Sequence, residues 1–182
     1  FPIGIGVLHP NAANTSMLTI NNNNLQHYCP TGAGLYTYNV QQTCKVDRNG
    51  IDLYNTSGPA TPSPIAAGIY VEKSHYTQFL GNVVAGNMTL LGTGDYFDAM
   101  RMKSSTDCEL LCNLFSYTRY GLRVEGDNST GPTMVKGNSH IGHGRGWYFQ
   151  NIVPVEATLA DVGTPTFDNA NLFYSADLLG GG

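Results

Sequence analysis

The sequence is poor in charged residues. Asp, Glu, Lys and Arg make up only 12% of its 182 residues, against roughly 25% in a typical globular protein. Because helix surfaces normally carry Glu, Lys and Arg, this deficit argues against a mainly helical protein. The polar surface must come from Asn, Thr, Ser, Gly and Tyr, and the 22 glycines suit a chain with many turns.

The sequence also lacks basic runs and long apolar runs. With a net charge of −4 and a pI near 5.6, nucleic acid is not expected as a partner. No apolar stretch approaches the roughly 18 residues of a membrane-spanning helix, so we expect no membrane partner. The chain starts Phe1-Pro2-Ile3-Gly4, with neither Met nor the regions of a signal peptide, so we expect a piece of a longer protein or a processed product.

Neither the cysteines nor the histidines have the spacing of a strong metal site. Cys108 and Cys112 are wider apart than a zinc knuckle, and no His is close in sequence. We interpret the four cysteines as buried free thiols, with a disulfide or a metal site as alternatives. His140 and His143 have His-x-x-His spacing without further ligands nearby, which favours a glycine-rich turn. We therefore predict no metal and no cofactor.

A five-residue pattern recurs through the middle of the chain: glycine, apolar, polar, apolar, polar. The clearest copies are Gly68–Glu72 and Gly121–Glu125. Looser copies begin at Gly34, Gly50, Gly146 and, without the glycine, at Asp98. Alternation of period two is typical of a strand with one buried face, and related strands in one short chain indicate a repeat architecture.

The spacing of the copies is irregular, and a second signal accompanies them. Asn82, Asn113 and Asn138 each follow an apolar residue two positions earlier. Asn tolerates a left-handed backbone and can hydrogen-bond to an equivalent Asn in the next repeat. Strands joined by loops of variable length, with recurring Asn turns, favour a parallel β-helix over a repeat of fixed period.

On these motifs, residues 30–152 resemble the right-handed parallel β-helix of pectate lyases and bacteriophage tailspikes. The resemblance implies an all-β solenoid of about five to six rungs. The alternative fold is an antiparallel β-sandwich, whose strands also alternate but which gives no reason for aligned Asn turns. We expect residues 1–30 to be an N-terminal cap or the end of an upstream domain, with an extra irregular rung as the alternative. Residues 31–152 would be the β-helix and residues 153–182 a C-terminal cap, an oligomer contact or both.

In each copy, the third and fifth residues should point outward and form two ladders. One ladder is predicted to contain Tyr36, Asp52, Tyr70, Arg101, Arg123 and Tyr148. The other is predicted to contain Tyr38, Tyr54, Glu72, Lys103, Glu125 and Gln150. Such a face can be an ion-paired solvated surface, a subunit contact, or a Tyr-rich surface for an extended polysaccharide.

If the face binds a polysaccharide, the predicted glycan-binding residues are Tyr36, Tyr38, Tyr54, Tyr70, Arg101, Arg123 and Tyr148. The catalytic candidates are Glu72, Asp98 and Glu125, because glycoside hydrolysis needs two carboxyl groups about 5–10 Å apart. Arg101 is a further candidate, because lyase chemistry needs a base beside a group that neutralises the sugar carboxylate. No local motif selects either reaction.

The resemblance implies a component of a phage tailspike or related virion surface protein. Such a protein would be a homotrimer that contacts other virion proteins and recognises a host capsule or O-antigen glycan. One alternative is a purely structural decoration or trimerising segment without activity. Another is a secreted polysaccharide lyase or hydrolase. Whether the chain is an enzyme is left open by the sequence.

Overall fold

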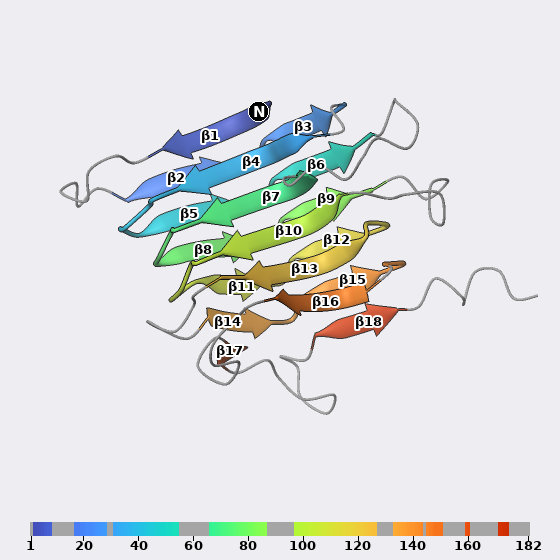
Figure 1. The fold of residues 1–182 in the computed structure, drawn as a ribbon. Helices are drawn as coiled ribbons and strands as arrows, with labels where there is room; N and C mark the ends of the chain where they lie inside the picture. Colours follow the sequence, from blue (N-terminus) through green and yellow to red (C-terminus); the bar gives the residue numbers. More distant parts are fainter. Residues whose placement is uncertain are drawn as a thin grey trace, which may run out of the picture.

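The repeated strands stack in parallel, as their shared alternation requires. The computed structural model describes residues 2–8, 17–28, 31–54, 66–86, 97–126, 133–143, 145–150, 159–160 and 171–174. Over these residues the chain winds as a right-handed parallel β-helix, and each turn, or rung, adds one strand to each of three sheets (Figure 1). The predicted fold class is confirmed, and the antiparallel sandwich is wrong, because every pairing between described strands is parallel.

Sheet A contains most of the predicted copies. Its order is β1 (Ile3–Leu8), β4 (Gly32–Tyr38), β7 (Ala66–Glu72), β10 (Asp98–Lys103), β13 (Tyr120–Glu125) and β16 (Arg145–Gln150). Met100 pairs with Ile69 on one side and with Leu122 on the other. These three side chains are fully buried in the core. The register predicted from the apolar pairs is therefore correct.

Sheets B and C complete each rung behind sheet A (Figure 1). Sheet B contains β2 (Leu18–Asn21), β5 (Cys44–Asp47), β8 (Thr77–Leu80), β11 (Glu109–Leu111), β14 (Thr133–Lys136) and β17 (Leu159–Ala160). Sheet C contains β3 (Asn24–His27), β6 (Gly50–Leu53), β9 (Val83–Ala85), β12 (Leu114–Ser116), β15 (Ser139–Ile141) and β18 (Leu172–Tyr174). Apolar residues from all three sheets fill one core inside the coil.

One predicted copy lies in a different sheet. Gly50–Leu53 is β6 of sheet C, and it pairs with β3 and β9 rather than with sheet A. The ladder positions predicted for Asp52 and Tyr54 are therefore wrong. The ring of Tyr54 instead stacks on Tyr28, with centroids 4.8 Å apart. Every strand of a coil alternates in the same way, so alternation alone does not identify the sheet.

The stack extends beyond the predicted boundaries at both ends. Strands β1, β2 and β3 pair with β4, β5 and β6, so these three strands form a first rung of the stack. Strands β17 and β18 continue sheets B and C after residue 153. A capping or oligomer-contact role for residues 153–182 stays a prediction, and most of this segment lies outside the described residues.

The glycine that opens the sheet A pattern makes room for sheet C. A Cβ added to Gly34 would lie 2.7 Å from Cγ2 of Ile51 and 3.0 Å from the carbonyl oxygen of Gly68. A Cβ at Gly68 would in the same way collide with Val84 of β9. Glycine is needed here because the side chain of the neighbouring sheet already occupies the space.

The predicted Asn turns form a continuous ladder between sheets B and C. Its members are Asn23, Asn49, Asn82, Asn113, Asn138 and Asn171. In the middle, Nδ2 and the backbone N–H of Asn82 donate to Oδ1 of Asn113 at 2.9 and 3.0 Å. Residues before these asparagines, such as Arg48 and Cys112, have left-handed backbones. The ladder satisfies buried polar groups at one corner of every rung.

Candidate functional site

The outer face of sheet A, outside the coil, carries three ladders of side chains. We call this surface the sheet A outer face. The two predicted ladders are present without Asp52 and Tyr54: Tyr36, Tyr70, Arg101, Arg123 and Tyr148 form one, and Tyr38, Glu72, Lys103, Glu125 and Gln150 the other. A third ladder, which the sequence pattern missed, contains Ala33, Ala67, Asp98, Tyr120 and Arg145. Its members precede the glycine of the motif, or Ala99 in the copy without the glycine, so they are not among the outward positions that the pattern predicts.

Aromatic rings and guanidinium groups lie next to one another along this face. Tyr36 stacks on Tyr70 with centroids 5.2 Å apart, and Tyr120 stacks on Tyr148 with centroids 4.5 Å apart. The guanidinium carbon of Arg123 lies 5.5 Å from the ring centroid of Tyr148 and 5.9 Å from that of Tyr120. Arginines over aromatic faces are held by cation–π attraction and remain able to donate hydrogen bonds.

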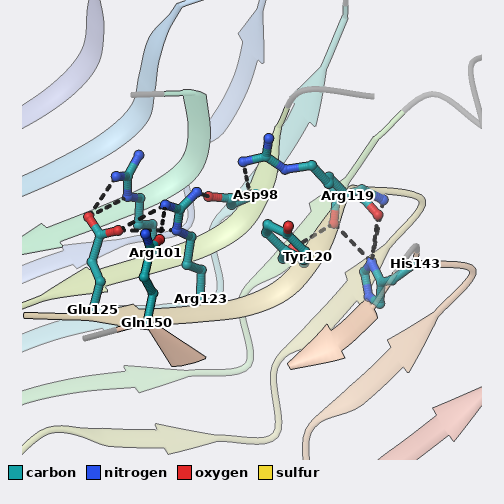
Figure 2. Close-up of polar contacts among 9 residues, drawn as sticks. Asp98, Arg101, Arg119, Tyr120, Arg123, Glu125, His143 and Gln150 are labelled. Atoms are coloured by element: carbon teal, nitrogen blue, oxygen red, sulfur yellow. Dashed lines mark hydrogen bonds and ion pairs between the residues drawn. The ribbon is translucent and has the colours of Figure 1, made fainter. Parts of the chain in front are cut away.

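Glu125 is the centre of an arginine network on β10, β13 and β16 (Figure 2). Arg101 donates to its Oε1 through Nε at 2.9 Å and through Nη2 at 2.6 Å. Arg123 approaches its other oxygen, with Nη2 3.0 Å from Oε2, and also donates to Oε1 of Gln150 at 2.7 Å. The charges of Arg101 and Glu125 are therefore largely matched within the face.

Asp98 lies beside this network, and its side chain is only 1% exposed. Nη2 of Arg119 donates to its Oδ1 at 3.2 Å, and Nη1 of Arg123 is 3.7 Å from its Oδ2 (Figure 2). Burial raises the pKa of Asp98 to about 6, although Arg119, Arg123 and Arg101 oppose this shift. Asp98 thus titrates closer to neutral pH than an ordinary carboxyl group.

Glu72 lies on β7, in the middle of the same face. It accepts a hydrogen bond from the hydroxyl of Tyr36 at 3.0 Å and lies 3.3 Å from Nζ of Lys103. Burial, together with the hydrogen bond to Glu72, raises the pKa of Tyr36 above its usual value. Tyr36 is therefore a neutral donor on this face and not a base near neutral pH.

The structure brings the four catalytic candidates onto one face, but their carboxyl groups are not free to reach a sugar, as hydrolysis requires. Glu72, Asp98 and Glu125 each form an ion pair with a Lys or Arg side chain, and the partner of Glu125 is Arg101. Asp98 is also enclosed by the chain. Since glycoside hydrolysis needs carboxyl groups that reach the sugar, the arrangement favours binding over proton transfer.

Exposure varies along the predicted glycan-binding face. Tyr70 is only 1% exposed, so the middle of the face is covered within a single chain. Tyr120, Arg123 and Tyr148 are half-buried, and Arg145 is exposed. The accessible part of the sheet A outer face is therefore its lower end, on β13 and β16.

His140 and His143 are packing residues in this structure. His140 lies in β15, is buried, and accepts a hydrogen bond from Nε1 of Trp147 at 3.0 Å. Burial lowers its pKa to about 3. Nε2 of His143 donates to the carbonyl oxygen of Phe115 at 3.0 Å. The glycine-rich turn predicted for both residues is thus correct only for His143.

The described residues contain no group of three or more His, Cys, Asp or Glu side chains arranged to hold a metal ion. Cys44 and Cys108 are buried free thiols, as predicted, but Cys112 is an exposed free thiol, so the predicted burial is wrong for this residue. Cys29 lies outside the described residues. Within the same part of the chain, we find no apolar helix of membrane-spanning length.

Comparison with known proteins adds no family to this geometry. No family model, no curated protein and no solved structure matches the chain.

Proposed function

We propose that this chain recognises a glycan through the sheet A outer face, as a component of a phage tailspike or related virion surface protein. The observation that carries the glycan proposal is the stacked pair Tyr120 and Tyr148, with Arg123 and Arg145 against the rings. Aromatic rings pack against the apolar faces of sugars, and guanidinium groups donate paired hydrogen bonds to hydroxyl or carboxylate oxygens.

The distribution of arginine supports the same face. Four of the five arginines of the chain, Arg101, Arg119, Arg123 and Arg145, lie on or reach over it. This concentration occurs in a chain with a net charge of −4. The arginines are therefore concentrated on one face of a chain that is negative overall. This concentration favours a ligand rich in oxygen acceptors.

The virion part of the proposal rests on the resemblance of the repeats and on a fold compatible with it. A fold does not by itself specify a function. The homotrimer, the contact with other virion proteins and the location at the virion surface belong to this same proposal. Light scattering of the purified chain tests the trimer directly.

A purely structural role is the second candidate, and one observation favours it. Arg101 with Glu125 and Arg119 with Asp98 are ion pairs made within the face. A face whose charges neutralise one another requires no ligand. The two proposals differ at the lower end of the face, where Arg145 is exposed and Tyr148 is half-buried.

A panel of capsular and O-antigen oligosaccharides, measured by calorimetry, tests the glycan proposal. We expect binding by the native chain and about three- to tenfold weaker binding by Tyr148→Ala, the loss typical of one aromatic contact. Tyr28→Ala is the matched control, because Tyr28 is an exposed, stacked tyrosine beside sheet C. No binding across the panel, or equal losses in both variants, contradicts the proposal. Release of reducing ends during incubation would support the hydrolase alternative.

A further inference from the structure

A groove of about 510 Å³ lies on a different side of the coil, against the outer face of sheet B. It is lined by Met17, Thr43, Lys45, Tyr76, Thr77, Gln78, Asp107 and Glu109. Lys45, Gln78 and Glu109 are direct neighbours on β5, β8 and β11. The groove therefore crosses successive strands and runs along the axis of the β-helix, separate from the sheet A outer face.

Tyr76 provides an aromatic wall in the middle of the groove. It lies at the corner between β7 and β8 with a left-handed backbone (φ 55°), and 56% of the residue is exposed. Its carbonyl oxygen accepts a hydrogen bond from the N–H of Cys44 in the rung above. The corner is thus tied to the stack while the tyrosine remains open to solvent, where a ligand can reach it.

The lower end of the groove carries two carboxylates, those of Asp107 and Glu109. Asp107 accepts a hydrogen bond from Oγ1 of Thr106 at 3.2 Å, and Glu109 accepts one from Nε2 of Gln78 at 2.6 Å. Among the described residues, no Lys, Arg or His forms an ion pair with either carboxylate. The carboxylates of the sheet A outer face, by contrast, are each bonded to a cation.

The positive charge in the groove lies two rungs away, on Lys45. Its Nζ is 4.0 Å from Oδ2 of Asp47, a carboxylate that also binds Arg48. Strands in a sheet are about 4.8 Å apart, so Lys45 and Glu109 are separated by roughly 10 Å along the axis. Among the described residues that line the groove, the uncompensated charge is therefore negative and lies on Asp107 and Glu109.

We propose that this groove binds an oligosaccharide that carries free amino groups. The ammonium group would donate hydrogen bonds to Asp107 and Glu109, where charge-assisted bonds are strongest. The apolar face of the neighbouring sugar would pack against Tyr76. Gln78, between them, supplies an amide for hydroxyl groups. This assignment is independent of the sheet A outer face.

Calorimetry with two matched trisaccharides tests the assignment. One is a trimer of glucosamine, with free amines, and the other is the trimer of N-acetylglucosamine, which has the same skeleton without the charge. We expect the native chain to bind the amine form at least tenfold more tightly at low salt, with the difference reduced at high salt. Equal binding of both trimers, or binding of neither, overturns the proposal.

Variants locate the site. The double substitution Asp107→Asn and Glu109→Gln should weaken binding of the glucosamine trimer at least tenfold and leave the thermal midpoint nearly unchanged. Asp52→Asn is the control, because it removes one carboxylate from the outside of sheet C. Tyr148→Ala should leave the affinity for the glucosamine trimer unchanged. An undiminished affinity in the double variant overturns the site even if the native chain binds the trimer.

Discussion

Arg101 donates two hydrogen bonds to a single oxygen of Glu125, one strand away on the outside of sheet A. The two side chains are only 11% and 12% exposed. A charge pair this far from water stabilises the chain little by its presence, but loss of one partner leaves the other charge buried. The pair fixes how β10 and β13 present the rest of the face.

Glu125→Gln should therefore destabilise the protein. We expect a loss of about 2–3 kcal/mol in the free energy of unfolding, because Arg101 and Arg123 lose their shared counter-charge. Urea unfolding followed by circular dichroism measures the change. Glu109→Gln is the matched control, since Glu109 has no ion pair within the described residues, and it should shift stability by less than about 0.5 kcal/mol. Similar losses in the two variants would contradict the role of the pair.

The asparagine ladder predicts a cost that depends on position in the stack. Oδ1 of Asn113 accepts two hydrogen bonds from Asn82, and its Nδ2 donates to the carbonyl oxygen of Phe79 and to Asn138. Asn113→Ala leaves buried donors and acceptors unsatisfied, so we expect a loss of about 3 kcal/mol or more in unfolding free energy.

Asn23→Ala is the control for the ladder, because Asn23 stands at its first rung. Its side chain donates to Asn21 and Asn49, and the backbone N–H of Asn23 still reaches Oδ1 of Asn49 after truncation. We expect a loss below about 1 kcal/mol. Urea unfolding measures both variants. Equal losses of unfolding free energy for Asn113→Ala and Asn23→Ala would show that burial does not determine how much each asparagine stabilises the protein.

Much of the fold could be predicted because a strand with one buried face shows an alternation of apolar and polar residues in the sequence. Met100 aligned with Ile69 and Leu122 through alternation alone, although 22 to 31 residues separate them. The sheet to which Gly50 belongs could not be predicted in this way, because strands of all three sheets alternate. Asn49 was missed for a related reason: only the packing shows that it continues the row of Asn82 and Asn113.

The candidate site was predictable only in part. Arg101, Arg123 and Tyr148 were placed correctly, because outward positions follow from register. Tyr120 and Arg145 were missed because they stand before the glycine of the motif, and Arg119 because it lies in the bend before β13. The burial of Tyr70 depends on what covers the outside of sheet A, and alternation carries no information about that.

The glycine of the motif has a testable packing role. Gly34→Ala should cost about 1–3 kcal/mol, because the new methyl group meets Cγ2 of Ile51 at 2.7 Å and the backbone of Gly68 at 3.0 Å. Gly50→Ala is the control: its Cβ would lie 3.6 Å from Oδ1 of Asn24, an ordinary contact. We expect Gly50→Ala to be neutral or slightly stabilising. Thermal unfolding compares the two, and equal destabilisation would contradict the packing explanation.

Asp98 and His140 predict opposite dependences of stability on pH. The folded-state pKa of Asp98 is raised from 3.8 to about 6, so between these values the folded chain binds more protons than the unfolded chain. Its contribution to stability is therefore highest below pH 3.8 and is lost as the pH rises through about 6. The pKa of His140 is lowered from 6.5 to about 3, so its contribution is present above pH 6.5 and is lost as the pH falls towards 3.

These two contributions partly cancel between about pH 4 and pH 6, and Asp98→Asn separates them. Because asparagine does not titrate, the variant should gain stability relative to the native chain as the pH rises across this interval, by an order of about 2 kcal/mol. Urea unfolding of both chains at several pH values measures the difference. In the variant, Arg119 and Arg123 also lose the counter-charge of Asp98. This loss lowers the stability of the variant by an amount that does not change with pH. The slope of the difference with pH, and not its absolute value, therefore reports the raised pKa, and a flat difference would show that Arg119 and Arg123 outweigh the burial of Asp98.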